Sequence, residues 1–314
     1  MYEAVPPSGG AVFFALMSFS PLVPQLDWAT HPALPELISR ALAEDVGPAD
    51  HTSRATVPPS LVGQAQCLVK QAGVLAGVAL ARQVFRIVDS TVRFTEHVPD
   101  GAPISPGQVA FTVQGPVQSL LMAERLVLNS MQRMSGIATL TRQLVEAVAG
   151  TGATVLDTRK TTPGLRLLEK WAVRLGGAEN HRWGLSDMIL IKDNHVDYAG
   201  GIAAALTAAS RYQQDQGLHL PVVIETRTLK EVTEVLQCYT AGLCVHRILL
   251  DNMPLPMLQQ AVALVAGQLP TEASGGITLA TARAVAEIGV NYLSVGALTH
   301  SAQALDISLK AVAA

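Results

Sequence analysis

The second half of the chain repeats one pattern that limits its fold more than any other feature. From Ala153 onward, segments of helical spacing alternate with six short apolar runs, ATVLD, MILIK, PVVIE, HRILLD, PTEASG and NYLSVG. Strands separated by helices pair in parallel. An eight-stranded barrel takes roughly 250 residues, whereas Ala153 to Ala314 holds about 160. We therefore expect an incomplete parallel α/β barrel of six to seven strands over residues 138–300, with a doubly wound sheet as the alternative.

The region before the barrel has a different texture. HPALPELISRALAEDVG has helical spacing and ends in Gly47, and later runs such as TVRFTEHVPDGAPISPGQVAFTVQGPV alternate apolar and polar residues between Gly and Pro. This alternation predicts an antiparallel sheet with tight turns. A long helical pattern then follows, interrupted at Ser135-Gly136, where we place a domain boundary. We expect an α+β domain over residues 26–137, a C-terminal helix over about 301–314 that packs on it, and a weakly ordered extension over 1–25.

Charge and cysteine content exclude several classes of partner. The net charge of −3 disfavours nucleic acid or an anionic membrane as a partner of the whole surface. No apolar run reaches the length of a membrane span. The three cysteines, Cys67, Cys238 and Cys244, form no CxxC pair, which disfavours a disulfide or a zinc site and indicates a reducing, cytoplasmic setting. Any anion must therefore be bound locally.

Polar residues or glycines follow all six expected strands. They are Asp157 to Lys160, Lys192, Glu225, Asp251, Ser274 to Gly276, and Gly296. In parallel α/β folds, ligands bind at this end of the strands. Helix capping accounts for an Asp or a Ser at such a position, but not for Arg159 or Lys192.

The cations near these strand ends fall into two groups. Four of them lie beside turns or at strand ends: Arg159, Lys160, Arg182 and Lys192. Four converging cations repel one another unless an anion joins them. Arginine forks suit carboxylates, and lysine suits phosphate as a point charge. Arg166, Lys170 and Arg174 fall at i, i+4 and i+8 of an expected helix that starts near Thr162-Pro163, and we interpret them as a solvated helix face.

The acids and glycines complete the expected pocket. Glu225 and Asp251 end neighbouring strands, and carboxylates in a phosphate site commonly hold Mg²⁺. We favour a contact with metal or ribose hydroxyls over a role as salt-bridge partners of the cations. Ser274-Gly275-Gly276 and Ser294 to Ala297 can offer unobstructed backbone N–H groups to phosphate. The residues thus predict a pocket for one carboxylate-bearing ligand and one phosphorylated, metal-chelating ligand.

Several long motifs resemble one family. DTRKTTPGLR, GGAENHRWGLSDMILIKDNH, LLDNM, SGGIT and SVGALTHS resemble quinolinate phosphoribosyltransferase (nicotinate-nucleotide pyrophosphorylase, carboxylating), and the resemblance runs from about Leu37 to ALDISLK. It implies an open sandwich domain followed by an incomplete α/β barrel, in dimers or larger assemblies. It also implies a pentosyltransferase that uses Mg²⁺ to join quinolinate and phosphoribosyl pyrophosphate. The products are nicotinate mononucleotide, pyrophosphate and CO₂, in a step of NAD synthesis.

The same resemblance assigns roles by motif. Arg159, Lys160, His181, Arg182 and Lys192 correspond to quinolinate and phosphate ligands, with Thr158 beside them. Glu225 and Asp251 correspond to the acids that contact ribose and metal, so that they and Lys160 are the catalytic candidates. The phosphate loops correspond to Ser274, Gly275, Gly276, Val295, Gly296, Ala297 and His300. Arg125, in AERLVLN, resembles an arginine that the family contributes from a neighbouring subunit.

Three other readings stay open. A Schiff-base aldolase would also place Lys160 or Lys192 at a barrel strand end, but it needs that lysine free of neighbouring cations. A non-catalytic phosphate-binding or regulatory protein would not need both acids and both glycine loops. A pyrophosphorylase of the same fold that acts on another pyridine or on a molybdenum-transport-linked substrate would not need the dicarboxylate set Arg159, Arg182 and Lys192.

Overall fold

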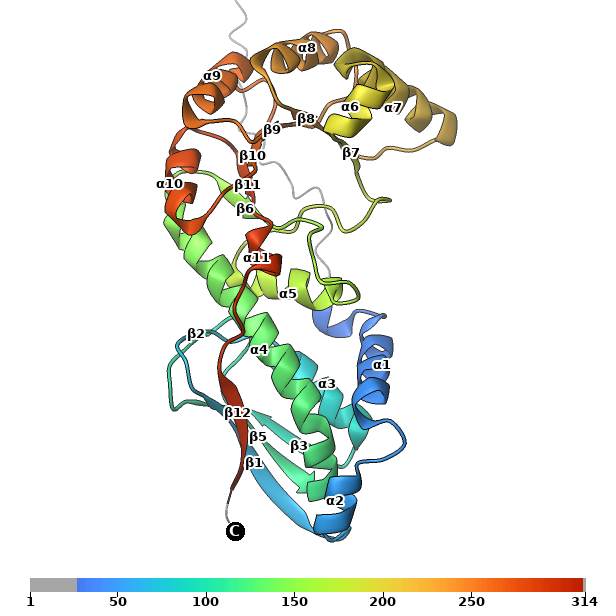
Figure 1. The fold of residues 1–314 in the computed structure, drawn as a ribbon, viewed down its shortest axis with the longest axis vertical. Helices are drawn as coiled ribbons and strands as arrows, with labels where there is room; N and C mark the ends of the chain where they lie inside the picture. The colour runs from blue at the N-terminus through green and yellow to red at the C-terminus, as the bar shows by residue number, and fades with distance from the viewer. Residues whose placement is uncertain (1–26, 313–314) are drawn as a thin grey trace, which may run out of the picture.

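A computed structural model of the chain describes residues 27–312, so the extension expected over residues 1–25 lies outside the described residues. The described chain forms two parts joined by one long helix, α4 (Val117–Ala147) (Figure 1). One part contains an antiparallel sheet, and the other contains a parallel sheet bordered by helices. The expected α/β class, with an N-terminal α+β part followed by an incomplete barrel, is confirmed.

The N-terminal part is built on a four-stranded sheet of order β12-β1-β5-β3, in which all neighbours are antiparallel. Its elements up to α4 are η1 (Trp28–Thr30), α1 (Leu34–Val46), α2 (His51–Thr56), β1 (Val62–Val69), β2 (Gly73–Val74), α3 (Val78–Val88), β3 (Arg93–Glu96), β4 (Pro103–Ile104) and β5 (Val109–Pro116). Helix α1 ends at Val46 and is capped by Gly47, the glycine at which the helical pattern of the sequence stops. The apolar stripe of α3 packs on the sheet, where the ring of Phe85 lies 6.2 Å from those of Phe94 and Phe111.

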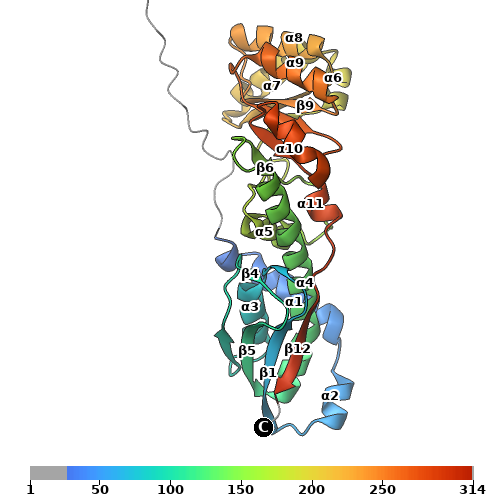
Figure 2. The same cartoon turned by 90° about the vertical axis from the view of Figure 1, so that its left-hand side faces the viewer.

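The predicted C-terminal helix over residues 301–314 is wrong. Ile307–Val312 forms strand β12, which pairs antiparallel with β1 in a register that joins Val69 to Ile307 (Figure 2). The physical reason lies in the alternation of this segment, because Ile307 and Leu309 are buried while Lys310 is exposed. A period of two matches a strand with one face on the core. The segment does pack on the N-terminal part, but as an edge strand.

Helix α4 runs without a break through Ser135 and Gly136, where we expected an interruption. Both residues serve close packing. The Ser135 hydroxyl accepts a hydrogen bond from the Ala76 N–H at 2.9 Å. A Cβ on Gly136 would clash with the carbonyl of Gln303, so the glycine lets the chain that leads to β12 pass against the helix.

The second part contains six parallel strands, as predicted. They are β6 (Thr154–Leu156), β7 (Ile189–Ile191), β8 (Val222–Thr226), β9 (Arg247–Asp251), β10 (Thr271–Ser274) and β11 (Tyr292–Ser294). Their order is β6-β11-β10-β9-β8-β7, so β6 and β7 are edge strands and the barrel is open between them. Strand β8 is buried at all five positions, as expected for a strand covered on both faces.

Helices border this sheet (Figure 1). They are α5 (Arg166–Gly176), α6 (Asp193–Ala199), α7 (Ile202–Gln216), α8 (Leu229–Thr240), α9 (Leu255–Val265), α10 (Leu279–Glu287) and α11 (Ala297–His300). Helix α5 packs against α4 and thereby attaches the barrel to the N-terminal part. Because all six strands run in one direction, their carboxyl ends meet at one edge of the sheet.

Candidate active site

A pocket of about 570 Å³ lies at the carboxyl ends of the barrel strands. Its lining includes eleven of the residues singled out in the sequence: Thr158, Arg159, Lys160, His181, Arg182, Lys192, Glu225, Asp251, Ser274, Gly275 and Gly276. These residues come from segments spread between β6 and the loop after β10. The reasoning from strand ends therefore brought together residues that are distant in sequence and neighbours in space.

The last loop lies beside this pocket. A Cβ on Gly296 would lie 2.9 Å from Cδ of Lys160 and 3.3 Å from the His300 imidazole, so the Lys160 side chain passes directly over this glycine. Val295 is buried below the loop, and Ala297 begins α11. The Thr299 hydroxyl donates to the Lys160 carbonyl at 2.7 Å, which fixes the backbone of Lys160 against α11.

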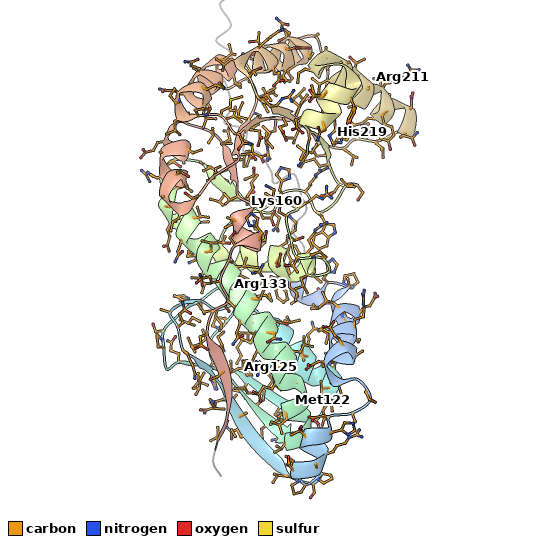
Figure 3. All side chains as sticks on the ribbon, viewed as in Figure 1. Met122, Arg125, Arg133, Lys160, Arg211 and His219 are labelled. Carbon is orange, nitrogen blue, oxygen red and sulfur yellow. The ribbon has the colours of Figure 1, made fainter. Side chains whose placement is uncertain are left out.

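Arg125 lies elsewhere in its own chain. It is exposed on α4, in a separate hollow of about 420 Å³ that Glu44 and Asp45 also line. Figure 3 shows it on the part of α4 that crosses the sheet, away from Lys160 at the barrel. A single chain therefore does not bring Arg125 to the pocket.

Two arginines of the pocket, the buried Arg182 and the half-buried Arg159, each carry a buried N–H group without a hydrogen-bond partner in the described part of the chain. Arg182 is 5% exposed and donates through Nη1 to the Met188 carbonyl at 3.2 Å. The Nε atoms of Arg182 and Arg159 are buried and have no hydrogen-bond partner within residues 27–312. Burial, and after it the charge of Arg159, lowers the pKa of Arg182. Two like charges and two unmet donors make this side of the pocket suited to an anion.

The two acids lie on neighbouring strands, as predicted. Glu225 is in β8 and Asp251 ends β9, and these strands pair in parallel. Burial, and after it the Asp251 and Asp193 carboxylates, raises the pKa of Glu225, while Lys192 opposes the rise. Asn252 donates to Asp251 Oδ2 at 2.6 Å, and a Cβ on Gly275 would clash with the Asn252 side chain. Gly275, at φ 92°, therefore allows the glycine loop to close on the acids.

Glu272 was missed in the sequence, although it lines the pocket. It is 0% exposed, accepts from Arg247 Nη1 at 2.7 Å, and lies 3.3 Å from Nε2 of His181. Burial alone would raise the pKa of Glu272, but His181 and Arg247 hold it at about 2. Arg247 in turn lies over the Tyr292 ring, 3.8 Å from its centroid. The sequence did contain a signal for this pair, because Arg247 and Glu272 are charged residues within two short buried strands, β9 and β10.

The interpretation of Arg166, Lys170 and Arg174 as a solvated face is wrong. Lys170 is 0% exposed and donates to Asp157 Oδ1 at 2.6 Å. Arg166 donates to the carbonyl of Trp183 at 3.0 Å, and Arg174 donates to that of Ala178 at 3.1 Å. The reason is that α5 is enclosed between α4 and the loop that carries residues 178–183, so its polar stripe faces protein instead of water.

A second missed residue, Arg133 on α4, connects the two parts of the molecule (Figure 3). It pairs with the buried Glu169 of α5 at 2.8 Å and donates to the carbonyls of Thr299 and Ala302. Glu169 also accepts from the Thr162 hydroxyl at 2.8 Å. This cluster holds the loop after β6 against helix α11 and the chain that follows it.

The chain is similar to proteins of one family over most of its length. The family model described as quinolinate phosphoribosyl transferase, N-terminal domain, matches residues 50–135 of the sequence. The family model for the C-terminal domain matches residues 137–310. The quinolinate phosphoribosyltransferase [decarboxylating] 1b of Nicotiana tabacum is 46% identical over 293 residues, which cover 89% of this chain and 83% of the relative. A probable nicotinate-nucleotide pyrophosphorylase [carboxylating] of Bacillus subtilis is 41% identical over 283 residues, covering 89% and 93%.

Solved structures agree with these relatives. NadC from Streptococcus pyogenes superposes with a TM-score of 0.82 at 38% identity, covering 89% of this chain and 97% of that one. The nicotinate-nucleotide pyrophosphorylase from Francisella tularensis superposes with a TM-score of 0.83 at 33% identity, covering 93% and 99%. Within residues 27–312, no helix is both long and apolar enough to cross a membrane. The family models, the relatives and the superposed structures together show that this chain belongs to the quinolinate phosphoribosyltransferase family.

Proposed function

We propose that this chain transfers the phosphoribosyl group of phosphoribosyl pyrophosphate to quinolinate with loss of CO₂. The bond from ribose C1 to the pyrophosphate oxygen breaks, and the lone pair of the pyridine nitrogen forms the new bond to C1. The carboxylate beside that nitrogen then leaves as CO₂, and a proton from water takes its place. The products are nicotinate mononucleotide, pyrophosphate and CO₂, in a step of NAD synthesis. The observation that carries this proposal is one pocket that contains two arginine Nε donors without a partner among residues 27–312, together with two acids on neighbouring strands and a glycine loop.

The arginine side suits quinolinate. Quinolinate carries two carboxylates on neighbouring ring carbons, and Arg159, Arg182 and Lys192 would bind them, with His181 beside them. Guanidinium groups bind carboxylates through two parallel hydrogen bonds, which fixes direction as well as position. Holding both carboxylates aims the ring nitrogen at C1. The same cations stabilise the negative charge that develops on the ring when CO₂ leaves.

The other side suits phosphoribosyl pyrophosphate. Glu225 and Asp251 would contact the ribose and stabilise the positive charge that develops at C1 as pyrophosphate leaves. Lys160 and His300, together with the backbone N–H groups of Ser274–Gly276 and Val295–Ala297, would hold phosphate oxygens. Thr158 supports Lys160, because its hydroxyl accepts a hydrogen bond from the Lys160 N–H at 3.0 Å. The chemistry needs position and charge, not a protein nucleophile.

Magnesium fits the donors on this side. Within residues 27–312, no group of three or more His, Cys, Asp or Glu side chains is arranged to hold a metal ion. Mg²⁺ does not need such a group, because it keeps several waters and binds through one or two carboxylates plus substrate phosphates. Glu225 and Asp251 are the carboxylates that would hold it, directly or through water. When bound, it neutralises charge on the leaving pyrophosphate.

A second copy of the chain would complete the site. Arg125 is exposed and remote from its own pocket, so we propose that it enters the pocket of a neighbouring subunit in a dimer or a larger assembly.

We also propose a cytoplasmic location, because all three cysteines are free thiols.

An isotope assay tests this function. Purified protein is given phosphoribosyl pyrophosphate, Mg²⁺ and quinolinate labelled at the carboxylate beside the nitrogen. Labelled CO₂, pyrophosphate and nicotinate mononucleotide should form in equal amounts, and none should form without phosphoribosyl pyrophosphate. Failure to release CO₂ would refute the proposal. In the same preparation, trapping of a carbonyl substrate on Lys160 or Lys192 by borohydride would support an aldolase instead.

A further inference from the structure

Lys170 and Asp157 form an ion pair that is closed off from solvent. Lys170 lies in α5 and Asp157 follows β6, with Nζ 2.6 Å from Oδ1 and both side chains 0% exposed. Burial raises the pKa of Asp157 and lowers the pKa of Lys170, and each partner opposes the shift of the other. Removing two charges from water costs about as much as their attraction returns, so such a pair adds little net stability. The residues that the pair binds, Asn180 and His181, indicate a role other than stability.

The pair holds two successive residues of the loop after α5. The Asp157 carboxylate accepts from the His181 N–H at 2.7 Å and from the Asn180 side-chain amide at 2.7 Å. Lys170 Nζ donates to the His181 carbonyl at 3.2 Å, and the Lys170 carbonyl accepts from the Asn180 amide at 3.0 Å. Both backbone polar groups of His181 are therefore bound to the two members of one buried ion pair.

The His181 ring is held as well. Its Nδ1 accepts from the N–H of Arg182 at 2.8 Å, and its Nε2 faces Glu272 Oε1 at 3.3 Å. The backbone of Arg182 is thus bound to His181, whose own backbone is bound to Lys170 and Asp157. The Arg182 guanidinium is buried in the pocket, and its Nε has no hydrogen-bond partner among the described residues.

We propose that Lys170 and Asp157 are positioning residues that set the place of Arg182 for binding the substrate carboxylates. This inference rests on the proposed function. Neither side chain is among the described residues that line the pocket, so neither would contact a substrate. Apart from Lys160, the groups proposed to bind phosphoribosyl pyrophosphate lie in or after β8 to β11, whereas Lys170 and Asp157 bind the loop that leads from α5 to β7. Disturbing the pair should therefore weaken quinolinate binding and leave phosphoribosyl pyrophosphate binding nearly unchanged.

The first test replaces Lys170 by methionine, which keeps the length of the side chain and removes its charge. In Lys170→Met, the KM for quinolinate should rise at least about tenfold, while the KM for phosphoribosyl pyrophosphate stays within about threefold of wild type. Two controls accompany it. Lys230→Met makes the same change at an exposed position of α8 and should leave both KM values unchanged. Leu258→Ala opens a cavity under α9 and should lower the Tm without separating the two KM values.

A milder variant decides the question if Lys170→Met does not fold. Asn180 is half-buried, and Asn180→Ala keeps the ion pair while it removes both hydrogen bonds from the amide to the pair. Its KM for quinolinate should rise at least about threefold, with the KM for phosphoribosyl pyrophosphate unchanged. Wild-type kinetics in Asn180→Ala, or equal rises for both substrates, would overturn the inference. A wild-type protein that does not consume quinolinate would refute the proposed function itself.

Discussion

Arg247 donates to Glu272 across neighbouring strands β9 and β10 at 2.7 Å, and this buried pair supports the pocket floor beside His181. The pKa of Glu272 is about 2 in the folded chain, against 4.5 for an ordinary glutamate. Because the pKa is lower in the folded chain, the ionised carboxylate stabilises the protein above about pH 4.5, and this stabilisation is lost as the pH falls toward 2. The shift in pKa corresponds to about 3 kcal/mol in the free energy of unfolding.

Glu272→Gln tests this linkage. The variant lacks the titrating group, so its free energy of unfolding should fall less steeply than that of wild type between about pH 5 and pH 3. Urea unfolding at several pH values measures the difference between the two proteins. If the difference in the free energy of unfolding between the two proteins stays constant over this range, the pKa of Glu272 is not lowered in the folded protein.

Arg182→Ala should lower kcat/KM for quinolinate at least about tenfold, because a buried fork for a carboxylate disappears. The matched control is Arg211→Ala in α7, where the arginine side chain is 84% exposed and its ion pair with Asp215 is long, at 3.8 Å (Figure 3). Arg166 is unsuited as the control, since it holds the Trp183 carbonyl next to Arg182. If Arg211→Ala loses as much activity as Arg182→Ala, the assignment of the anion site is wrong.

Quinolinate should be preferred to nicotinate by at least about a hundredfold in kcat/KM. Nicotinate lacks one carboxylate, so a buried arginine donor would stay unmet in its complex, at a cost of a few kcal/mol. Competition between the two acids at fixed phosphoribosyl pyrophosphate measures the ratio. Comparable turnover of both acids would contradict a dicarboxylate site.

Mixing two inactive variants tests the shared site. Arg125→Ala and Glu225→Ala protein are combined under conditions that exchange subunits. In a mixed dimer one site collects both defects and the other has none, so activity should return to about a quarter of wild type. Exchange without recovery would show that Arg125 acts within its own chain or not at all.

The site could be predicted largely because parallel strands end at one edge. Each of Lys192, Glu225, Asp251 and Ser274 follows or ends a short apolar run, and that position alone was enough to place them around one pocket. Glu272 escaped this reasoning because it lies within its strand and not at the end. Its partners come from another strand and from a loop, and no local pattern records them.

The errors share a cause in long-range packing. The spacing of Lys170 along its helix is the same whether the stripe faces water or a buried Asp157, so the sequence of α5 does not record its burial. Strand β12 finds its partner β1 more than 230 residues earlier in the chain. The alternation of Ile307 and Leu309 was the local signal, and it is short enough to be mistaken for half of a helical stripe.

The most direct test follows nicotinate mononucleotide by NMR, in wild type and in Glu225→Gln, from quinolinate and phosphoribosyl pyrophosphate. Wild type should form the mononucleotide with one CO₂ for each molecule. Glu225→Gln should stay folded and form it at least about a hundredfold more slowly, because the variant loses the charge that stabilises C1 as pyrophosphate leaves. No mononucleotide from wild type, or equal rates in the two proteins, would contradict the claim that this pocket carries out the transfer.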